Sequence, residues 1–224
     1  MIKMIAIDLD STTLNNRTAI SSNVIKILRR KREQGIHIIL MSEHPYFYVK
    51  EMTKKLGLNL NEYFISCQGA HIHKPPSIKP YKNFALQKND YIKIFNFANR
   101  FNIDIYALTE KFIHSHFSII SQGAITESYK SQKSIHSFPI SELSKNSDIS
   151  KICLFGCKNT LDSLKRRIPE KFLDEYNITR NGNECIDITS RKSSKEHALK
   201  VITQKLKLEQ HEIIIIRDIV NDMI

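Results

Sequence analysis

The sequence lacks any hydrophobic run close to the roughly 18 residues that a membrane-spanning helix needs, and it has no internal repeat and no low-complexity segment. Its first residues lack the charged, apolar and small-residue regions of a signal peptide. Of its 224 residues, 41% are hydrophobic and 25% are charged, which is typical of a globular protein. We therefore expect a cytoplasmic protein of one large or two small domains, with no membrane as a partner.

Cysteine is scarce, and its spacing argues against a metal-binding framework. The four cysteines are Cys67, Cys153, Cys157 and Cys185, and no two of them form a CxxC pair. No histidine or cysteine cluster accompanies the spacing of Cys153 and Cys157. We interpret all four as reduced structural thiols, with a zinc site as the weaker alternative.

Acidic residues are fewer than basic ones, 23 against 34, and the net charge is +11. The basic residues are spread along the chain, for example at 29–32, 54–55 and 165–167, where helices with an apolar opposite face are expected. Solvated helix faces are the favoured interpretation, and attraction of anionic substrates is the second. Nucleic-acid binding would rest on net charge alone and is not expected.

Two carboxylates close the first apolar stretch of the chain. The run from Met4 fits a buried strand, and Asp8 and Asp10 follow at a spacing that points both side chains to the same side. Like charges so placed repel unless a cation or hydrogen-bond donors separate them. Mg²⁺, a hard cation with oxygen ligands, is the natural partner, whereas a simple polar turn is the alternative interpretation.

Strand and helix patterns alternate at both ends of the sequence. We expect a first helix that carries Val24, Ile27 and Leu28 on its buried face. Alternation of this kind is typical of an α/β fold with a parallel, Rossmann-like sheet. The strands are expected from Met4 and over 36–41, 63–66 and 212–216, and the helices over about 22–35, 46–56 and 194–206.

The middle of the sequence has a different pattern, typical of an inserted α+β domain. We expect a core domain of residues 1–82 and 188–224 and an insert of residues 83–187, with a proline-rich hinge or linker at 74–80. The insert's elements are expected to be a helix over 89–100 with Ile92, Phe95 and Ala98 inward, a hairpin of 103–108 with 112–116, a strand over 151–155, a helix over 161–173 broken at Pro169, and a hairpin across Asn181-Gly182-Asn183.

Polar residues follow each of the four strands of the expected parallel sheet. They are Asp8 with Asp10, Ser42, Gln68, and the segment 218–222. The carboxyl edge of an open parallel sheet is where ligands bind, so these clusters are expected to converge there. With Lys195 at a helix start, two carboxylate clusters predict a magnesium and phosphate site.

The same residues resemble the four motifs of the haloacid dehalogenase superfamily, in order. Asp8-Leu9-Asp10-Ser11-Thr12 resembles the first motif, DxDGT, and Ser42 after an apolar strand resembles the second. Lys195 resembles the third motif, and Asp218 to Asp222 resembles the fourth. Gln68-Gly69-Ala70 is similar to the Asn-Gly-Ala step of the Cof-type branch (class IIB), whose type C2 cap matches the insert in place and size. The resemblance covers essentially the whole chain.

The resemblance implies catalytic roles for Asp8 and Asp10 and phosphate-binding roles for Ser42 and Lys195. Asp8 would be the nucleophile and a magnesium ligand, and Asp10 the general acid and base, with its backbone carbonyl on the metal. Ser42 would hydrogen-bond the phosphoryl oxygens, and Lys195 would neutralise charge on Asp8 and on the phosphate.

Five further positions receive binding roles from the same resemblance. Asp218 would ligate magnesium and Asp222 would hold the metal and its water shell. Asn221, Leu9 and Glu43 would belong to the phosphate- or substrate-binding set.

The implied activity is that of a Mg²⁺-dependent phosphatase. Its substrate would be a small phosphorylated metabolite, such as a sugar phosphate, hydrolysed through an aspartyl-phosphate intermediate, with the cap closing over the site and selecting the substrate.

Departures from the family pattern support an alternative, a catalytically weakened relative that binds phosphate ligands or a protein partner. Ser11 replaces a glycine, Glu43 places a carboxylate near the phosphate, and Arg217 replaces the glycine before Asp218. The sequence ends at Ile224, where family members continue for about one strand-helix-strand unit. We therefore expect apolar surface at one sheet edge, which favours a homodimer.

Overall fold

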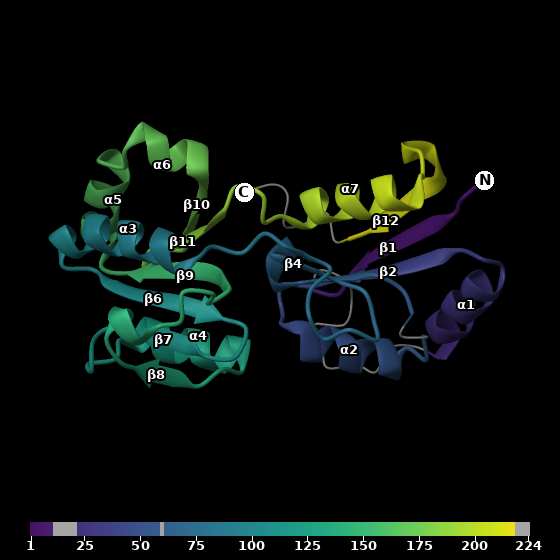
Figure 1. Ribbon diagram of the computed structural model, residues 1–224, viewed down its shortest axis with the longest axis horizontal. Helices are drawn as coiled ribbons and strands as arrows, with labels where there is room; N and C mark the ends of the chain where they lie inside the picture. Colours follow the sequence, from purple (N-terminus) through teal and green to yellow (C-terminus); the bar gives the residue numbers. More distant parts are fainter. Residues whose placement is uncertain (11–21, 59–60, 218–224) are drawn as a thin grey trace. The chain divides into compact units, whose positions relative to one another are not determined.

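The computed structural model describes residues 1–10, 22–58 and 61–217 (Figure 1). The chain forms two compact units, residues 1–83 with 192–224 and residues 84–191. The second unit is therefore one continuous segment inserted into the first. Their assignment as catalytic core and cap, with the boundaries expected above, stays a prediction. Within the described ranges, no helix has the length and apolar character needed to cross a bilayer.

The first unit is built on a six-stranded mixed sheet with the order β12-β1-β2-β3-β4-β5. The four strands from β12 to β3 are parallel, as expected for an α/β fold, and β4 and β5 are added antiparallel. Their bounds are β1 (Met4–Asp8), β2 (His37–Met41), β3 (Phe64–Ser66), β4 (His71–His73), β5 (Lys82–Asn83) and β12 (Ile213–Ile216).

Helices cover both faces of this sheet, with α7 on one face and α1 and α2 on the other (Figure 1). All five residues of β1 are buried, which explains its uninterrupted apolar sequence before Asp8. The helices are α1 (Ser22–Glu33), α2 (Tyr46–Lys55) and α7 (Lys195–Leu206). Two single turns, η2 (Cys67–Gly69) and η5 (Gln210–Glu212), lie between β3 and β4 and between α7 and β12.

Helix α1 corrects one expectation about the buried face. Leu28 is buried, but Val24 and Ile27 are 45% and 55% exposed, and Ile25 packs against the core instead. Ile25 and Leu28 are three positions apart and therefore share a face, which places Val24 and Ile27 beside it rather than on it.

The proline-rich segment 74–80 is not a linker between the units. It connects β4 to β5, which pair with each other inside the first unit, and the chain passes to the second unit only after Asn83. The prediction of a hinge or linker from the composition of this segment is therefore wrong.

At the far edge of the same sheet, β12 presents exposed apolar side chains. Among the described residues, β12 pairs with β1 alone, and Ile214, Ile215 and Ile216 are 42%, 49% and 41% exposed. The expectation of apolar surface at a sheet edge agrees with this exposure, whereas the homodimer stays a prediction.

The second unit is a second six-stranded mixed sheet, with the order β10-β11-β9-β6-β7-β8. One apolar cluster packs α3 and α5 on one face, and a smaller one packs α4 on the other. The elements are α3 (Lys88–Ala98), η3 (Asn99–Phe101), β6 (Asp104–Thr109), β7 (Ile113–Ser115), α4 (Gln122–Ser131), β8 (Ile135–Ser137), η4 (Ile140–Glu142), β9 (Ile149–Phe155), α5 (Lys158–Arg166), α6 (Glu170–Glu175), β10 (Tyr176–Asn181) and β11 (Cys185–Ser190).

Most elements expected in the insert are present. Strands β6 and β7 and strands β10 and β11 form the two antiparallel hairpins, and the helix expected over 161–173 is interrupted before Pro169. The undecided segment 117–150 contains α4 and β8, and β8 runs parallel to β7. In α3, Ala98 is buried as expected, but Tyr91, Ile94 and Phe97 are buried in place of Ile92 and Phe95.

Candidate active site

Asp8 and Asp10 lie at the carboxyl end of β1. Asp8 is the last residue of the strand, faces Met41 of β2 in the pairing register, and is 8% exposed. The backbone N–H of Asp10 donates to Oδ1 of Asp8 at 3.0 Å. The turn after β1 thus folds back on the first carboxylate and holds the second beside it.

The loop after β2 supplies hydrogen-bond donors to Asp10. The Ser42 hydroxyl donates to Oδ1 of Asp10 at 2.7 Å, and the backbone N–H of Glu43 donates to Oδ2. The backbone N–H of His44 in turn donates to Oγ of Ser42 at 3.0 Å. Two of the expected site residues, Ser42 and Glu43, are therefore in contact with the second carboxylate.

Lys195, the first residue of α7, connects the two carboxylates. Its Nζ lies 2.8 Å from both oxygens of Asp8 and 2.8 Å from Oδ2 of Asp10. Burial alone would lower the pKa of Lys195, but the attraction and hydrogen bonds of Asp10 and Asp8 outweigh burial and raise this pKa. The three side chains are only 11–15% exposed, which strengthens their electrostatic interaction.

The start of α7 is held against the sheet by a glycine. Gly69 of η2 has φ +87°, and a Cβ there would lie 2.2 Å from the carbonyl carbon and oxygen of Ser194 and 2.7 Å from N of Lys195. Ser194 caps α7, because its hydroxyl accepts from the backbone N–H of His197 at 3.0 Å. Close packing at Gly69 and the cap together place Lys195 at the site.

The charges at the site fit a divalent cation. Asp8 and Asp10 carry two negative charges against the single positive charge of Lys195, so the described cluster has one excess negative charge. A phosphate dianion would be repelled by such a cluster, whereas a divalent cation reverses its sign. Carboxylate oxygens are the ligands that Mg²⁺ prefers. These residues therefore fit the expected metal.

Several expected site residues lie outside the described residues. They are Ser11, Asp218, Asn221 and Asp222. The structure describes Arg217, and its guanidinium lies 3.5 Å from Oε1 of Glu196.

Neither the side chain nor the backbone N–H of Leu9 is available to a ligand. Its side chain is fully buried, and its backbone N–H donates to the carbonyl of Met41 at 2.9 Å. Its assignment to the phosphate-binding set stays a prediction that neither of these groups supports.

Sequence reasoning missed two aromatic rings beside Asp10. The rings of His44 and Tyr48 are 4.3 Å apart between centroids, and a ligand atom of His44 lies within 4.8 Å of carboxylate oxygens of Asp10 and Glu43. Burial, and then the negative charge of Asp10, raise the pKa of the Tyr48 hydroxyl. The available signal was the four-residue spacing of these two residues across the start of α2.

A cavity of about 640 Å³ has Asp8 and Lys195 in its wall. Its lining continues along α7 and β12 and includes Leu199, Ile213 and Ile215. This volume is in the range of small-molecule sites. The Asp8 carboxylate and the Lys195 ammonium therefore border a space that can accept a small ligand.

Comparison with known proteins gives one family for the whole chain. The family model described as haloacid dehalogenase-like hydrolase matches residues 5–224. The chain is 25% identical to YxeH of Bacillus subtilis over 100% of this chain and 83% of that protein, and 24% identical to phosphatase YwpJ of the same species over 99% and 85%. A haloacid dehalogenase-like hydrolase from Bacteroides thetaiotaomicron has the same fold, with TM-score 0.76, 19% identity, and coverage of 96% of this chain and 81% of that one.

Proposed function

This chain belongs to the haloacid dehalogenase-like hydrolases, as its sequence motifs predicted, and is a phosphatase of that type. From this premise we propose that it hydrolyses a small phosphorylated metabolite, such as a sugar phosphate, with Mg²⁺ and through an aspartyl-phosphate on Asp8. The supporting observation is the contact of Lys195 with the carboxylates of both Asp8 and Asp10.

Asp8 is the proposed nucleophile. One of its oxygens attacks phosphorus, and the bond from phosphorus to the ester oxygen breaks. Asp10, ionised in the free site, takes up a proton from solvent when the substrate binds and passes it to the departing alcohol. Lys195 already contacts both oxygens of Asp8, so its charge lies where the phosphoryl group would be held.

Asp10 then serves as the base for the second half of the reaction. It takes a proton from water, the water oxygen attacks the phosphorus of the aspartyl-phosphate, and Asp8 is regenerated as phosphate leaves. Ser42 and the Glu43 N–H hold the Asp10 carboxylate in one orientation, which supports a proton-transfer role at a fixed position.

The metal would be held by Asp8 and by the backbone carbonyl of Asp10, with Asp218 and Asp222 completing the set expected from the family pattern. Mg²⁺ supplies positive charge that offsets the phosphate dianion. The chain's own part is the pair of carboxylates that gives the described cluster its excess negative charge.

The alternative is a weakened relative that only binds phosphate ligands or a protein. Glu43 donates its backbone N–H to Asp10, and a carboxylate oxygen of Glu43 also lies within 4.8 Å of one of Asp10, which favours this alternative. Arg217 forms an ion pair with Glu196.

Hydrolysis of p-nitrophenyl phosphate with and without Mg²⁺ tests the proposal. We expect Mg²⁺-dependent turnover in the natural chain and none above background in Asp8→Asn. Asp174→Asn, which removes an exposed carboxylate of α6, is the matched control and keeps its activity. Equal rates in the natural chain and Asp8→Asn would refute the enzymatic mechanism.

A further inference from the structure

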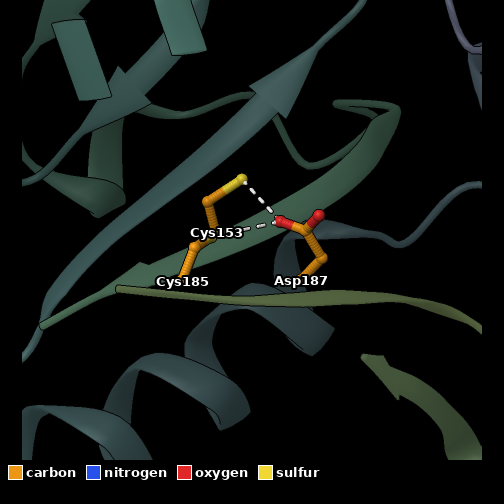
Figure 2. Close-up of side chains that lie close together, drawn as sticks. All are labelled: Cys153, Cys185 and Asp187. Atoms are coloured by element: carbon orange, nitrogen blue, oxygen red, sulfur yellow. Dashed lines mark hydrogen bonds between the residues drawn. The ribbon is translucent and has the colours of Figure 1, made fainter. Parts of the chain in front are cut away.

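Two cysteines and one aspartate meet inside the second unit (Figure 2). Cys153 comes from β9, and Cys185 and Asp187 come from the adjacent antiparallel strand β11. Oδ1 of Asp187 lies 3.2 Å from Sγ of Cys153 and 3.4 Å from Sγ of Cys185. Ligand atoms of all three residues lie within 4.8 Å of one another.

The aspartate is oriented toward the two thiols by its other oxygen. Oδ2 of Asp187 accepts a hydrogen bond from Nδ2 of Asn181 at 3.1 Å and lies 3.5 Å from Nζ of Lys151. A carboxylate that ligates a metal through one oxygen is usually held by hydrogen bonds to the other in this way.

We propose that Cys153, Cys185 and Asp187 bind a thiophilic divalent cation, Zn²⁺ in the first place, at a site separate from the proposed phosphatase centre.

The distances between the three groups suit a tetrahedral ion. With Zn–S near 2.3 Å and Zn–O near 2.1 Å, a tetrahedral site separates sulfur from oxygen by about 3.6 Å. The observed separations of 3.2 Å and 3.4 Å are close to this value. Three protein ligands leave a fourth position, which water can fill.

Binding would leave the local charge unchanged. Without metal, Asp187 and Glu127 are negative, Lys151 is positive and the thiols are neutral, with Nζ of Lys151 3.0 Å from Oε1 of Glu127. Zn²⁺ would replace the two thiol protons, which pass to solvent, and no electron is transferred. A buried cluster gains from this exchange because no new net charge enters the apolar interior.

The apolar surroundings of the two thiols disfavour hard cations, and the partly exposed Asp187 gives a metal ion a route from solvent. Cys153 is fully buried and both cysteines belong to an apolar cluster with Tyr106 and Leu108, whereas the Asp187 side chain is 18% exposed. Because both thiols must lose their protons on binding, metal affinity should increase with pH, and Mg²⁺, which prefers oxygen, should not compete.

Titration with Co²⁺ as a spectroscopic probe tests the site. The full chain, stripped with a chelator and kept in excess Mg²⁺, is expected to develop thiolate-to-cobalt charge-transfer absorption that saturates at one equivalent and disappears on adding Zn²⁺. Calorimetry in buffers of different ionisation enthalpy is expected to show two protons released per Zn²⁺. A folded natural chain with neither signal would overturn the proposal.

Variants then locate the binding residues. We expect Cys185→Ala to lower Zn²⁺ affinity by more than about 100-fold and Asn181→Ala, which removes only the support of Asp187, by about 10- to 100-fold. Cys157→Ser, at an exposed thiol, leaves affinity unchanged. Undiminished absorption in a folded Cys185→Ala, or its loss in Cys157→Ser, would contradict the proposal. Should Cys185→Ala fail to fold, the stoichiometry and proton release of the natural chain decide the question.

Discussion

Lys195 holds a position that no other described cation shares, in contact with both carboxylates of the candidate active site. We expect Lys195→Met to lower kcat on p-nitrophenyl phosphate by about 10²- to 10³-fold, the usual effect of removing one group that stabilises transition-state charge. Lys205→Met, at an exposed position of the same helix, is the control. Similar kcat values for the two variants would show that the contact serves structure alone.

Glu43 departs from the family pattern, and its carboxylate is expected to lie near the phosphate and repel it. A substitution can test this repulsion. The backbone N–H of Glu43 bonds Asp10, but its side chain is exposed, so Glu43→Gln keeps the bond and removes only the charge. We expect kcat/KM for a phosphate dianion to rise a few-fold at low ionic strength, and the gain to fade with added salt. An unchanged or lower kcat/KM would argue against repulsion.

At the scale of single residues, the sequence predicted which side chains gather but not how they contact one another. Asp8, Asp10, Ser42 and Lys195 were expected from the ends of strands and from the start of a helix. The bridging position of Lys195 depends on how tightly α7 approaches η2, which Gly69 permits. Packing of that kind joins residues far apart in the chain and leaves no periodic signal.

The junction of η2 and α7 gives a prediction at the scale of elements. Gly69→Ala would place a Cβ against the Ser194 carbonyl at a left-handed φ, whereas Gly182, with φ +66°, has open space around it. We expect Gly182→Ala to cost about 1–2 kcal/mol of unfolding free energy from backbone strain alone. Gly69→Ala should cost more and also lower kcat, because it displaces the start of α7. Equal losses of unfolding free energy in the two variants, measured in urea, would show that α7 shifts to accommodate the new Cβ with no further energetic cost.

The elements themselves were predicted with different success, for physical reasons. The parallel strands were visible because burial on both faces demands uninterrupted apolar residues, as in β1. Strand β5 has only two residues, Lys82 and Asn83, both exposed, so no pattern marks it. In α1 the apolar residues exceed what one face can bury, and only the packing decides that Leu28 is inside and Ile27 outside.

His73 of β4 makes the first unit sensitive to acid. Burial, and then the neighbouring His71, lower its pKa from 6.5 to about 4 in the folded chain, so below pH 6.5 the unfolded chain binds the additional proton. The free energy of unfolding is therefore unaffected by titration of this residue above pH 6.5. It decreases as pH falls toward 4, by up to about 3 kcal/mol.

The substitution His73→Phe tests this linkage. It keeps the aromatic packing on Phe64, loses the hydrogen bond with Ser66, and removes the titrating group. We expect the difference in unfolding free energy between about pH 7.5 and about pH 5 to shrink in His73→Phe, whatever its absolute stability. The exposed His136→Phe keeps the natural difference, and an unshrunken difference in His73→Phe would assign the acid sensitivity to other groups.

At the scale of the whole molecule, the excess positive charge has a structural explanation. Basic residues gather in the last turns of α1, α2 and α5, at 30–32, 54–55 and 165–166. Cations at a helix C-terminus interact favourably with the helix dipole. This arrangement accounts for much of the clustering without a nucleic-acid partner.

The second unit should fold without the first. Residues 84–191 are continuous in sequence, form their own six-stranded sheet, and bury a large apolar cluster that includes Tyr91, Ile105 and Leu161. A segment of this size with its own core meets the requirements of an independent domain. We expect the separate fragment 84–191 to unfold cooperatively in urea, and to develop the same cobalt absorption as the full chain, because the three proposed ligands all lie within it.

An Ile105→Ala fragment, with a cavity in the core, should lose about 2–5 kcal/mol of unfolding free energy, which distinguishes a packed domain from a collapsed chain. A fragment without a cooperative transition would show that its sheet needs the remainder of the chain to form.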